Sequence, residues 1–156
     1  MLPGEYIAYE RLRAQAVRLR EAVLGLGRSS PRDALLARLP KASVCAEIGT
    51  WKGDFAARIL NGTQPSRLYL IDPWQYRGES EYEHAMYGGY KPDGDQGMEA
   101  IYKGVLERFS AEIDSGQVVP MRMRSVDAVT KLADGALDWV YIDGDHTYES
   151  VRSDLV

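Results

Sequence analysis

Val44-Cys45-Ala46-Glu47-Ile48 is a short apolar run, and a turn with two glycines, Gly49-Thr50-Trp51-Lys52-Gly53, follows it directly. Apolar residues then recur at helical spacing over residues 52–60. A continuous apolar run of this length is typical of a strand that is buried on both faces. The stretch therefore predicts a β-strand, a tight turn and a helix, which is the unit from which parallel α/β sheets are built.

The alternation of strand and helix continues beyond this unit. Further apolar runs predict strands at residues 68–71, 117–123 and 137–142, and helical spacing predicts helices at about 98–113, 126–133 and from 147 onward. This order predicts an α/β fold with a doubly wound, Rossmann-like parallel sheet that stops after its fourth strand. Pro120 cannot donate a hydrogen bond to a neighbouring strand, so we expect the third strand at an edge of the sheet.

Helices are predicted before the first strand. Residues 4–26 have an amphipathic pattern, and Ser30-Pro31-Arg32-Asp33 carries the cap, the proline and the acid that favour the start of a second, short helix. We therefore expect an N-terminal helical segment, residues 1–40, and an incomplete α/β domain, residues 41–156. Residues 73–97 are rich in glycine and are predicted as a loop. The aromatic segment 74–102 is interpreted as a lid or substrate wall, with a solvated insertion as the alternative.

Composition narrows the class of protein. Hydrophobic residues make up 45% of the chain and charged residues 27%, which is ordinary for a soluble globular domain. The net charge is −4 and there is no basic block, so we expect no nucleic-acid partner. The first 30 residues contain no continuous apolar run, so neither a signal peptide nor a membrane partner is predicted, and we expect a cytoplasmic protein. The single cysteine, Cys45, is interpreted as a small core residue.

Three acids stand at or beside the carboxyl ends of predicted strands: Glu47, Asp72 and Asp143. Ligands of open parallel sheets bind outside these strand ends, where the strand order reverses. Acids on this rim favour a ligand with hydroxyl groups or a positive charge, and an acid about 20 residues after a glycine turn is the usual partner of a ribose diol. The turn from Gly49 to Gly53 does not have the fuller G-x-G-x-x-G pattern that a pyrophosphate normally requires.

Three segments carry a family resemblance. Residues 46–55, AEIGTWKGDF, resemble the first motif of class I S-adenosylmethionine-dependent methyltransferases, and residues 70–74, LIDPW, resemble the second. Residues 137–148, LDWVYIDGDHTY, are similar to a signature of a small-molecule O-methyltransferase branch that includes enzymes acting on macrolide sugars. The resemblance covers residues 42–155. It implies methyl transfer from S-adenosylmethionine to a small-molecule acceptor, in particular to a hydroxyl group.

The resemblance also implies roles for individual residues. Asp72 would accept both ribose hydroxyls, and Asp143 would face the transferring methyl group. The other cofactor-binding positions are the methionine-side residues Glu47, Gly49, Thr50 and Gly53, the adenosine neighbours Pro73 and Trp74, and the adenine-edge residues Ser125 and Val126.

The segment Asp143-Gly144-Asp145-His146 allows two kinds of chemistry. Asp143 could bind a hard cation such as Mg²⁺, which would lower the pKa of a substrate hydroxyl, or it could position the substrate. His146 is the candidate general base at neutral pH. The alternative interpretation of the segment is a turn followed by a helix cap.

Two other functions stay open, a non-catalytic cofactor-binding fragment or pseudoenzyme and, less favoured, a nucleotide-dependent oxidoreductase.

The resemblance implies a seven-stranded sheet in the order 3-2-1-4-5-7-6, of which four strands are found. The strand at 137–142 is apolar on both faces, and as an open edge it would recruit other chains. We therefore expect either further residues in the natural protein or a homo-oligomer that covers this edge.

Overall fold

The computed structural model describes residues 30–76 and 94–154. Internal contacts divide the chain into two units, Met1–Leu35 and Leu36–Val156. The helix predicted over 4–26 lies outside the described residues. The second predicted helix is confirmed as α2 (Pro31–Leu36). Its start is capped reciprocally, because the Asp33 amide donates to Ser30 Oγ and the Ser30 amide donates to Asp33 Oδ2.

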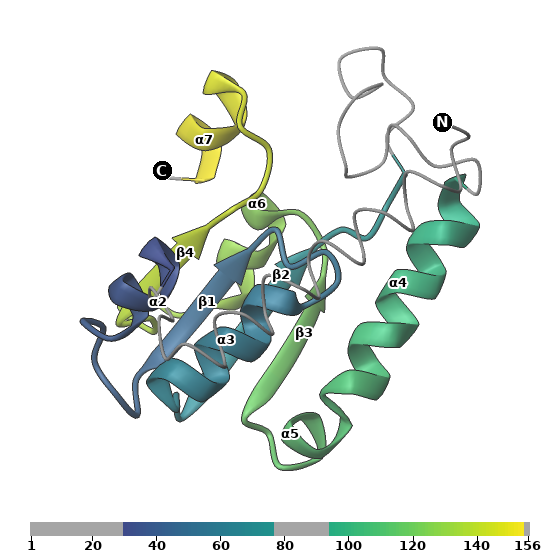
Figure 1. The fold of residues 1–156 in the computed structure, drawn as a ribbon. Helices are drawn as coiled ribbons and strands as arrows, with labels where there is room; N and C mark the ends of the chain where they lie inside the picture. Colours follow the sequence, from purple (N-terminus) through teal and green to yellow (C-terminus); the bar gives the residue numbers. More distant parts are fainter. Residues whose placement is uncertain (1–29, 77–93, 155–156) are drawn as a thin grey trace, which may run out of the picture. The chain divides into compact units, whose positions relative to one another are not determined.

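A parallel sheet forms the centre of the second unit. Its strands are β1 (Val44–Ile48), β2 (Arg67–Asp72), β3 (Val118–Arg122) and β4 (Trp139–Ile142), in the order β3-β2-β1-β4 (Figure 1). All three pairings are parallel. The chain builds β1, β2 and β3 in one direction and then returns to place β4 on the other side of β1. The predicted doubly wound α/β fold is therefore confirmed, and the strand order reverses between β1 and β4.

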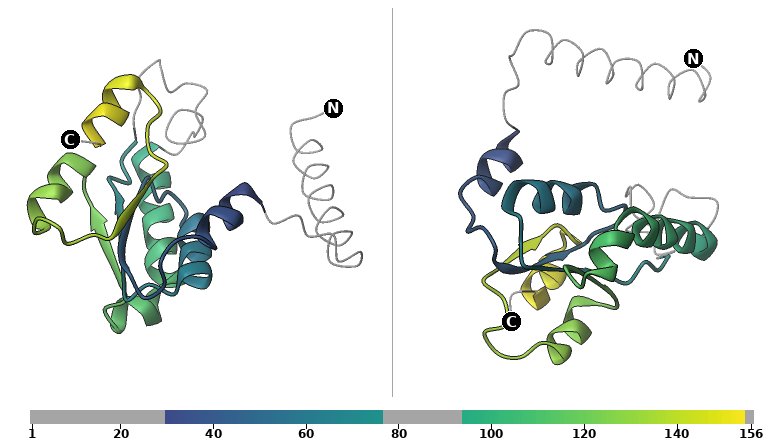
Figure 2. Two further views of the ribbon diagram at one scale, coloured as in Figure 1. Left: turned by 90° about the vertical axis from the view of Figure 1, so that its left-hand side faces the viewer. Right: turned by 90° about the horizontal axis from the view of Figure 1, so that it is seen from below.

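Helices cover both faces of the sheet. They are α3 (Asp54–Thr63), α4 (Gly94–Arg108), α5 (Ser110–Asp114), α6 (Ser125–Ala128) with the 3₁₀ turn Val129–Lys131, and α7 (Tyr148–Asp154). The view from below shows α3 on one side of the sheet and α6 on the other (Figure 2).

The two faces bury two separate cores because successive side chains of a strand point in opposite directions. Leu68 and Leu70 of β2 join the larger core, with residues of α3 and α4, whereas Ile71 joins a smaller core with Ala128 of α6. Cys45 belongs to the larger core and is fully buried, as predicted. Burial, together with the negative charge of Asp138, raises the pKa of the Cys45 thiol to about 12.

The edges of the described sheet agree with the sequence. Pro120 lies opposite Leu70 in β3, which is an edge strand, so the prediction from the missing N–H is confirmed. At the other edge stands β4, whose Val140 is 42% exposed. What covers this edge stays a prediction.

Two predicted helices are confirmed in position but are not continuous, and part of the loop prediction was wrong. The helix expected over 98–113 is two helices that break at Phe109, whose φ of −109° and ψ of 21° are not helical. The helix expected over 126–133 changes to a 3₁₀ turn after Ala128. Residues 94–97, predicted as loop, form the first turn of α4, and residues 77–93 of that loop lie outside the described residues.

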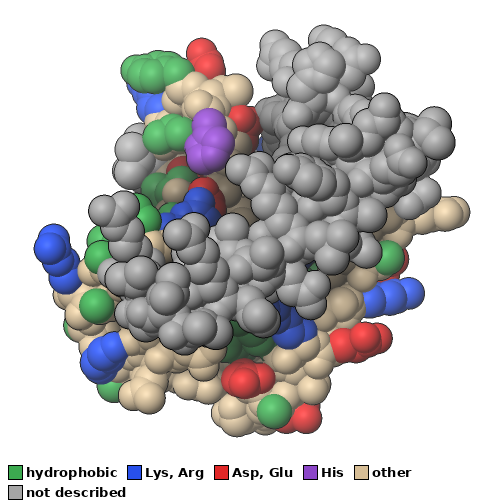
Figure 3. Space-filling model, in the orientation of Figure 1, with side chains coloured by type: hydrophobic (Ala, Val, Ile, Leu, Met, Phe, Trp, Pro, Cys, Tyr) green, Lys and Arg blue, Asp and Glu red, His purple; other side chains and the backbone are tan. Residues whose placement is uncertain are grey.

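Two further features concern the helices and the charges at the surface. Within residues 30–76 and 94–154, no helix combines the length and the apolar character that a membrane span requires. On the described part of the face in Figure 3, Lys and Arg side chains are interspersed with Asp and Glu.

Candidate functional site

The three predicted acids come together at the carboxyl end of the sheet. Ile48, the last residue of β1, lies opposite Ile71 and Ile142, so the carboxyl ends of β2, β1 and β4 are level. Asp72 and Asp143 therefore flank the turn that follows β1, and Glu47 precedes it. Glu47 and Asp72 are each 1% exposed, whereas Asp143 is half-buried.

Gly49 lies where the backbone of this turn meets the end of β4. Its φ is +89°, and a Cβ placed on it would lie 2.4 Å from the carbonyl oxygen of Asp143. Two hydrogen bonds hold the approach, from the Gly49 amide to the Ile71 carbonyl at 2.9 Å and from the Asp143 amide to the Ile48 carbonyl at 2.8 Å. The first glycine of the motif is therefore required by the protein's own backbone contact.

Gly53 meets a different constraint. It has a φ of +74°, and a Cβ on it would lie 2.6 Å from a ring carbon of Phe109. The second glycine therefore allows the aromatic ring at the α4–α5 break to pack directly against the turn.

Asp72 holds two turns of the backbone at once. One carboxylate oxygen accepts a hydrogen bond from the Trp51 amide at 2.9 Å, and the other accepts one from the Trp74 amide at 2.7 Å. Trp51 and Trp74 have φ values of +49° and +42°, a conformation that bulky residues rarely adopt. The Trp74 indole also donates to the Trp51 carbonyl at 2.7 Å. The carboxylate predicted to bind a ribose is thus also the anchor of the loops around it.

Trp74, predicted beside the adenosine, points its ring into the core. It is 1% exposed, and its ring packs against Tyr102 of α4 with 4.8 Å between centroids. The Asp-x-Trp spacing predicts the turn in which the Trp74 amide donates to Asp72. Asp side chains often accept a hydrogen bond from the backbone N–H two residues on. The sequence contained no comparable indicator of the contact with Trp51.

Thr50 is the residue of the glycine turn whose side chain is most suggestive of a ligand. It is 4% exposed, and among the described residues its hydroxyl oxygen has no hydrogen-bond partner. Buried polar atoms are nearly always hydrogen-bonded, so an exception in a candidate site requires an explanation. A polar ligand in this turn would provide one.

Ser125 and Val126, predicted at the adenine edge, line a cavity of about 660 Å³. The cavity lies against the sheet between α6 and α7, and its apolar walls include Ile48, Ile71 and Tyr148. The Ser125 hydroxyl donates a hydrogen bond to Asp154 of α7. The two residues therefore border a space with apolar walls and polar groups at its rim.

The start of α7 is capped by Thr147, whose hydroxyl oxygen accepts from the Ser150 amide at 3.3 Å, and Asp145 holds the turn before it. The Asp145 carboxylate accepts from the Thr147 amide at 3.0 Å and from the Ser150 hydroxyl at 2.9 Å. His146 is exposed at the surface. Among the described residues, no group of three or more His, Cys, Asp or Glu side chains is placed to hold a metal ion. The Mg²⁺ expectation at Asp143 therefore gains no support.

Comparison with known proteins identifies the family. A family model described as a methyltransferase domain matches residues 46–156. The match covers more than half of the chain, so the protein belongs to this methyltransferase-domain family. The matched segment begins in β1 and includes the glycine turn, Asp72 and Asp143. The comparison with curated proteins gives no match. The resemblance is thus confirmed for the methyltransferase domain, whereas the O-methyltransferase branch stays a prediction.

Proposed function

We propose that this protein transfers a methyl group from S-adenosylmethionine to a hydroxyl group of a small molecule. One observation carries the proposal: within a methyltransferase domain, Glu47, Asp72 and Asp143 lie at the point where the strand order of the sheet reverses. Open α/β sheets bind their ligands at this point. Carboxylates there suit a ligand that combines a ribose diol with a positive charge.

The residues present fit such a cofactor. A carboxylate can accept several hydrogen bonds at once, so the backbone N–H groups that hold Asp72 are compatible with a diol at the same group. Thr50 offers a buried hydroxyl in the adjacent turn. The cavity beside Ser125 and Val126 has the apolar walls and polar rim that a purine requires.

The chain's own residues would act mainly by positioning. The cofactor supplies a methyl group on a positively charged sulfur, and the protein has to align the acceptor oxygen with it. Asp143, at the end of β4, would orient the acceptor. His146, three residues on, would take the proton of the acceptor hydroxyl as general base at neutral pH.

Calorimetric titration with S-adenosylhomocysteine and with NAD⁺ tests the proposal. We expect binding of the first and none of the second. Binding of NAD⁺ alone would establish the oxidoreductase alternative, and binding of neither compound would overturn the proposal. If the protein binds S-adenosylhomocysteine but transfers no labelled methyl to any acceptor hydroxyl, the non-catalytic alternative holds.

Asp72→Ala should weaken S-adenosylhomocysteine binding by about 1–3 kcal/mol, which is the usual cost of leaving buried polar partners unmatched. Asp138→Ala is the matched control, because Asp138 also accepts a backbone amide, that of Val44 at 2.8 Å, but does so at the opposite end of the sheet. The control should bind as the unchanged protein does. Equal affinity of both variants would remove Asp72 from the site.

A further inference from the structure

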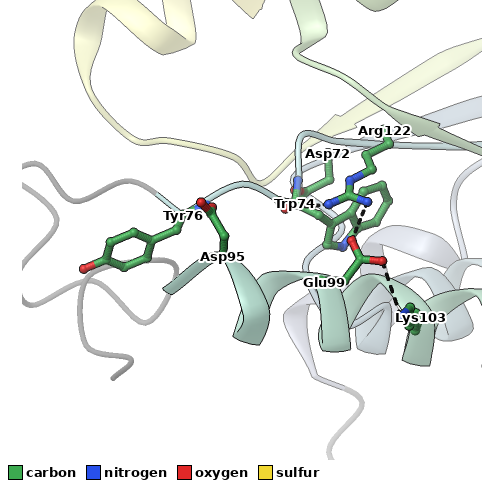
Figure 4. A network of polar contacts seen from close by, with 7 residues as sticks. All are labelled: Asp72, Trp74, Tyr76, Asp95, Glu99, Lys103 and Arg122. Atoms are coloured by element: carbon green, nitrogen blue, oxygen red, sulfur yellow. Dashed lines mark hydrogen bonds and ion pairs between the residues drawn. The ribbon is translucent and has the colours of Figure 1, made fainter. Parts of the chain in front are cut away.

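Arg122 connects the turn after β2 to α4. It ends β3 and lies directly opposite Asp72. One guanidinium nitrogen is 2.6 Å from a carboxylate oxygen of Glu99, and the other donates to the Trp74 carbonyl at 3.5 Å. The guanidinium also lies 4.7 Å from the centroid of the Tyr102 ring, within the range of a cation–π contact. Figure 4 shows the arginine spanning from the Trp74 turn to α4.

These contacts lead to Asp72 through Trp74. Tyr102, on which the guanidinium lies, packs against the Trp74 ring. The Trp74 amide in turn donates to Asp72, and its indole holds the Trp51 carbonyl. Arg122 therefore contacts the backbone of Trp74 and also Tyr102, which packs against the Trp74 ring. The Trp74 amide in turn binds one oxygen of the Asp72 carboxylate.

The turn after β2 borders a second cavity, of about 750 Å³, which is lined by Pro73, Trp74 and Gln75 of the turn and by residues of α4 that include Glu99. The bridge from Arg122 to Glu99 lies at its wall. Trp74 has a positive φ, and a strained conformation persists only where its surroundings hold it.

The exposure of the ion pair argues against a role in stability alone. The Arg122 and Glu99 side chains are 39% and 41% exposed, and ion pairs at such positions contribute little to folding. The hydrogen bond from Arg122 nevertheless lowers the pKa of Glu99. Through Arg122 the pair links the Trp74 turn to α4.

We propose that Arg122 is a positioning residue for the ribose-binding carboxylate of Asp72. The proposal rests on the proposed function, because it assumes that Asp72 accepts the ribose hydroxyls. In this role Arg122 would act on Asp72 and not on the ligand. It sets the angle of the Asp72 carboxylate through Trp74, so its loss should impair recognition of the diol more than binding in general.

The experiment compares S-adenosylhomocysteine with its 2′-deoxy analogue by calorimetry. We expect the unchanged protein to prefer the ribose form roughly tenfold, the usual value of one hydrogen bond to a charged group. Arg122→Met keeps the aliphatic part of the side chain and should reduce this preference to about twofold. Glu99→Gln should reduce it in the same direction and serves if Arg122→Met does not fold.

Arg124→Met is the control, because Arg124, directly before α6, forms a comparable exposed pair with Asp127 of that helix at 3.1 Å. It should keep the full preference. A purely structural role of Arg122 would weaken both ligands equally, and an unchanged ratio in Arg122→Met and Glu99→Gln would overturn the proposal. Failure of the unchanged protein to bind either ligand would instead refute the proposed function, and this inference with it.

Discussion

Gly49 leaves no room for a side chain. A methyl group there would meet backbone atoms of Asp143 and Gly144 at 2.4–2.6 Å, and these atoms are held by the pairing of β1 with β4. A φ of +89° adds strain for any residue with a Cβ. Both effects follow from the protein alone, before any ligand binds.

We predict that Gly49→Ala lowers the free energy of unfolding by about 2–4 kcal/mol, from backbone strain and steric overlap together. Gly104→Ala is the control, because Gly104 lies within α4 with no atom near its missing Cβ. This variant should gain about 0.5–1 kcal/mol from helix propensity. Denaturant unfolding of both variants measures the difference, and a Gly49→Ala protein as stable as the unchanged one would contradict the close approach.

At the same scale, the sequence predicted which acids form the rim but not how they are held. Glu47, Asp72 and Asp143 follow from where apolar runs end, because parallel strands bring their carboxyl ends to one edge. The left-handed conformations of Trp51 and Trp74 depend on contacts between loops that are distant in sequence. No local pattern of residues contains that information.

At the scale of elements, the break between α4 and α5 lets Phe109 pack against the glycine turn. Phe109 leaves the helical path and is 3% exposed, with its ring against Gly53. The helical spacing of apolar residues continues across residues 98–113, which is why the sequence predicted one helix. The break arises from packing against the glycine turn, which periodicity does not reveal.

A double-mutant cycle tests this contact. Phe109→Ala should cost about 3–4 kcal/mol of stability, as is usual for a buried aromatic residue. Gly53→Ala should be strongly destabilising in the unchanged protein but less so in the Phe109→Ala background, because the colliding ring is gone. The remaining cost reflects the φ of +74°. Strictly additive effects in chemical unfolding would show that the ring and the turn are not in contact.

At the scale of the whole molecule, the order of the strands determines where a ligand binds. All four strands were predicted because each is a short apolar run, and Pro120 identified an edge strand. The reversal between β1 and β4 then places the glycine turn, Asp72 and Asp143 around one point. The nature of the acceptor does not follow from this topology, because it depends on side chains that line the acceptor's own pocket.

A crystal structure of the complex with S-adenosylhomocysteine tests the account most directly. It should show the ribose hydroxyls within hydrogen-bonding distance of the Asp72 carboxylate, the homocysteine end over Gly49 and Thr50, and the adenine near Ser125. A ligand bound elsewhere, for example in the cavity beside Glu99 and Arg122, with Asp72 touching only the amides of Trp51 and Trp74, would contradict the account.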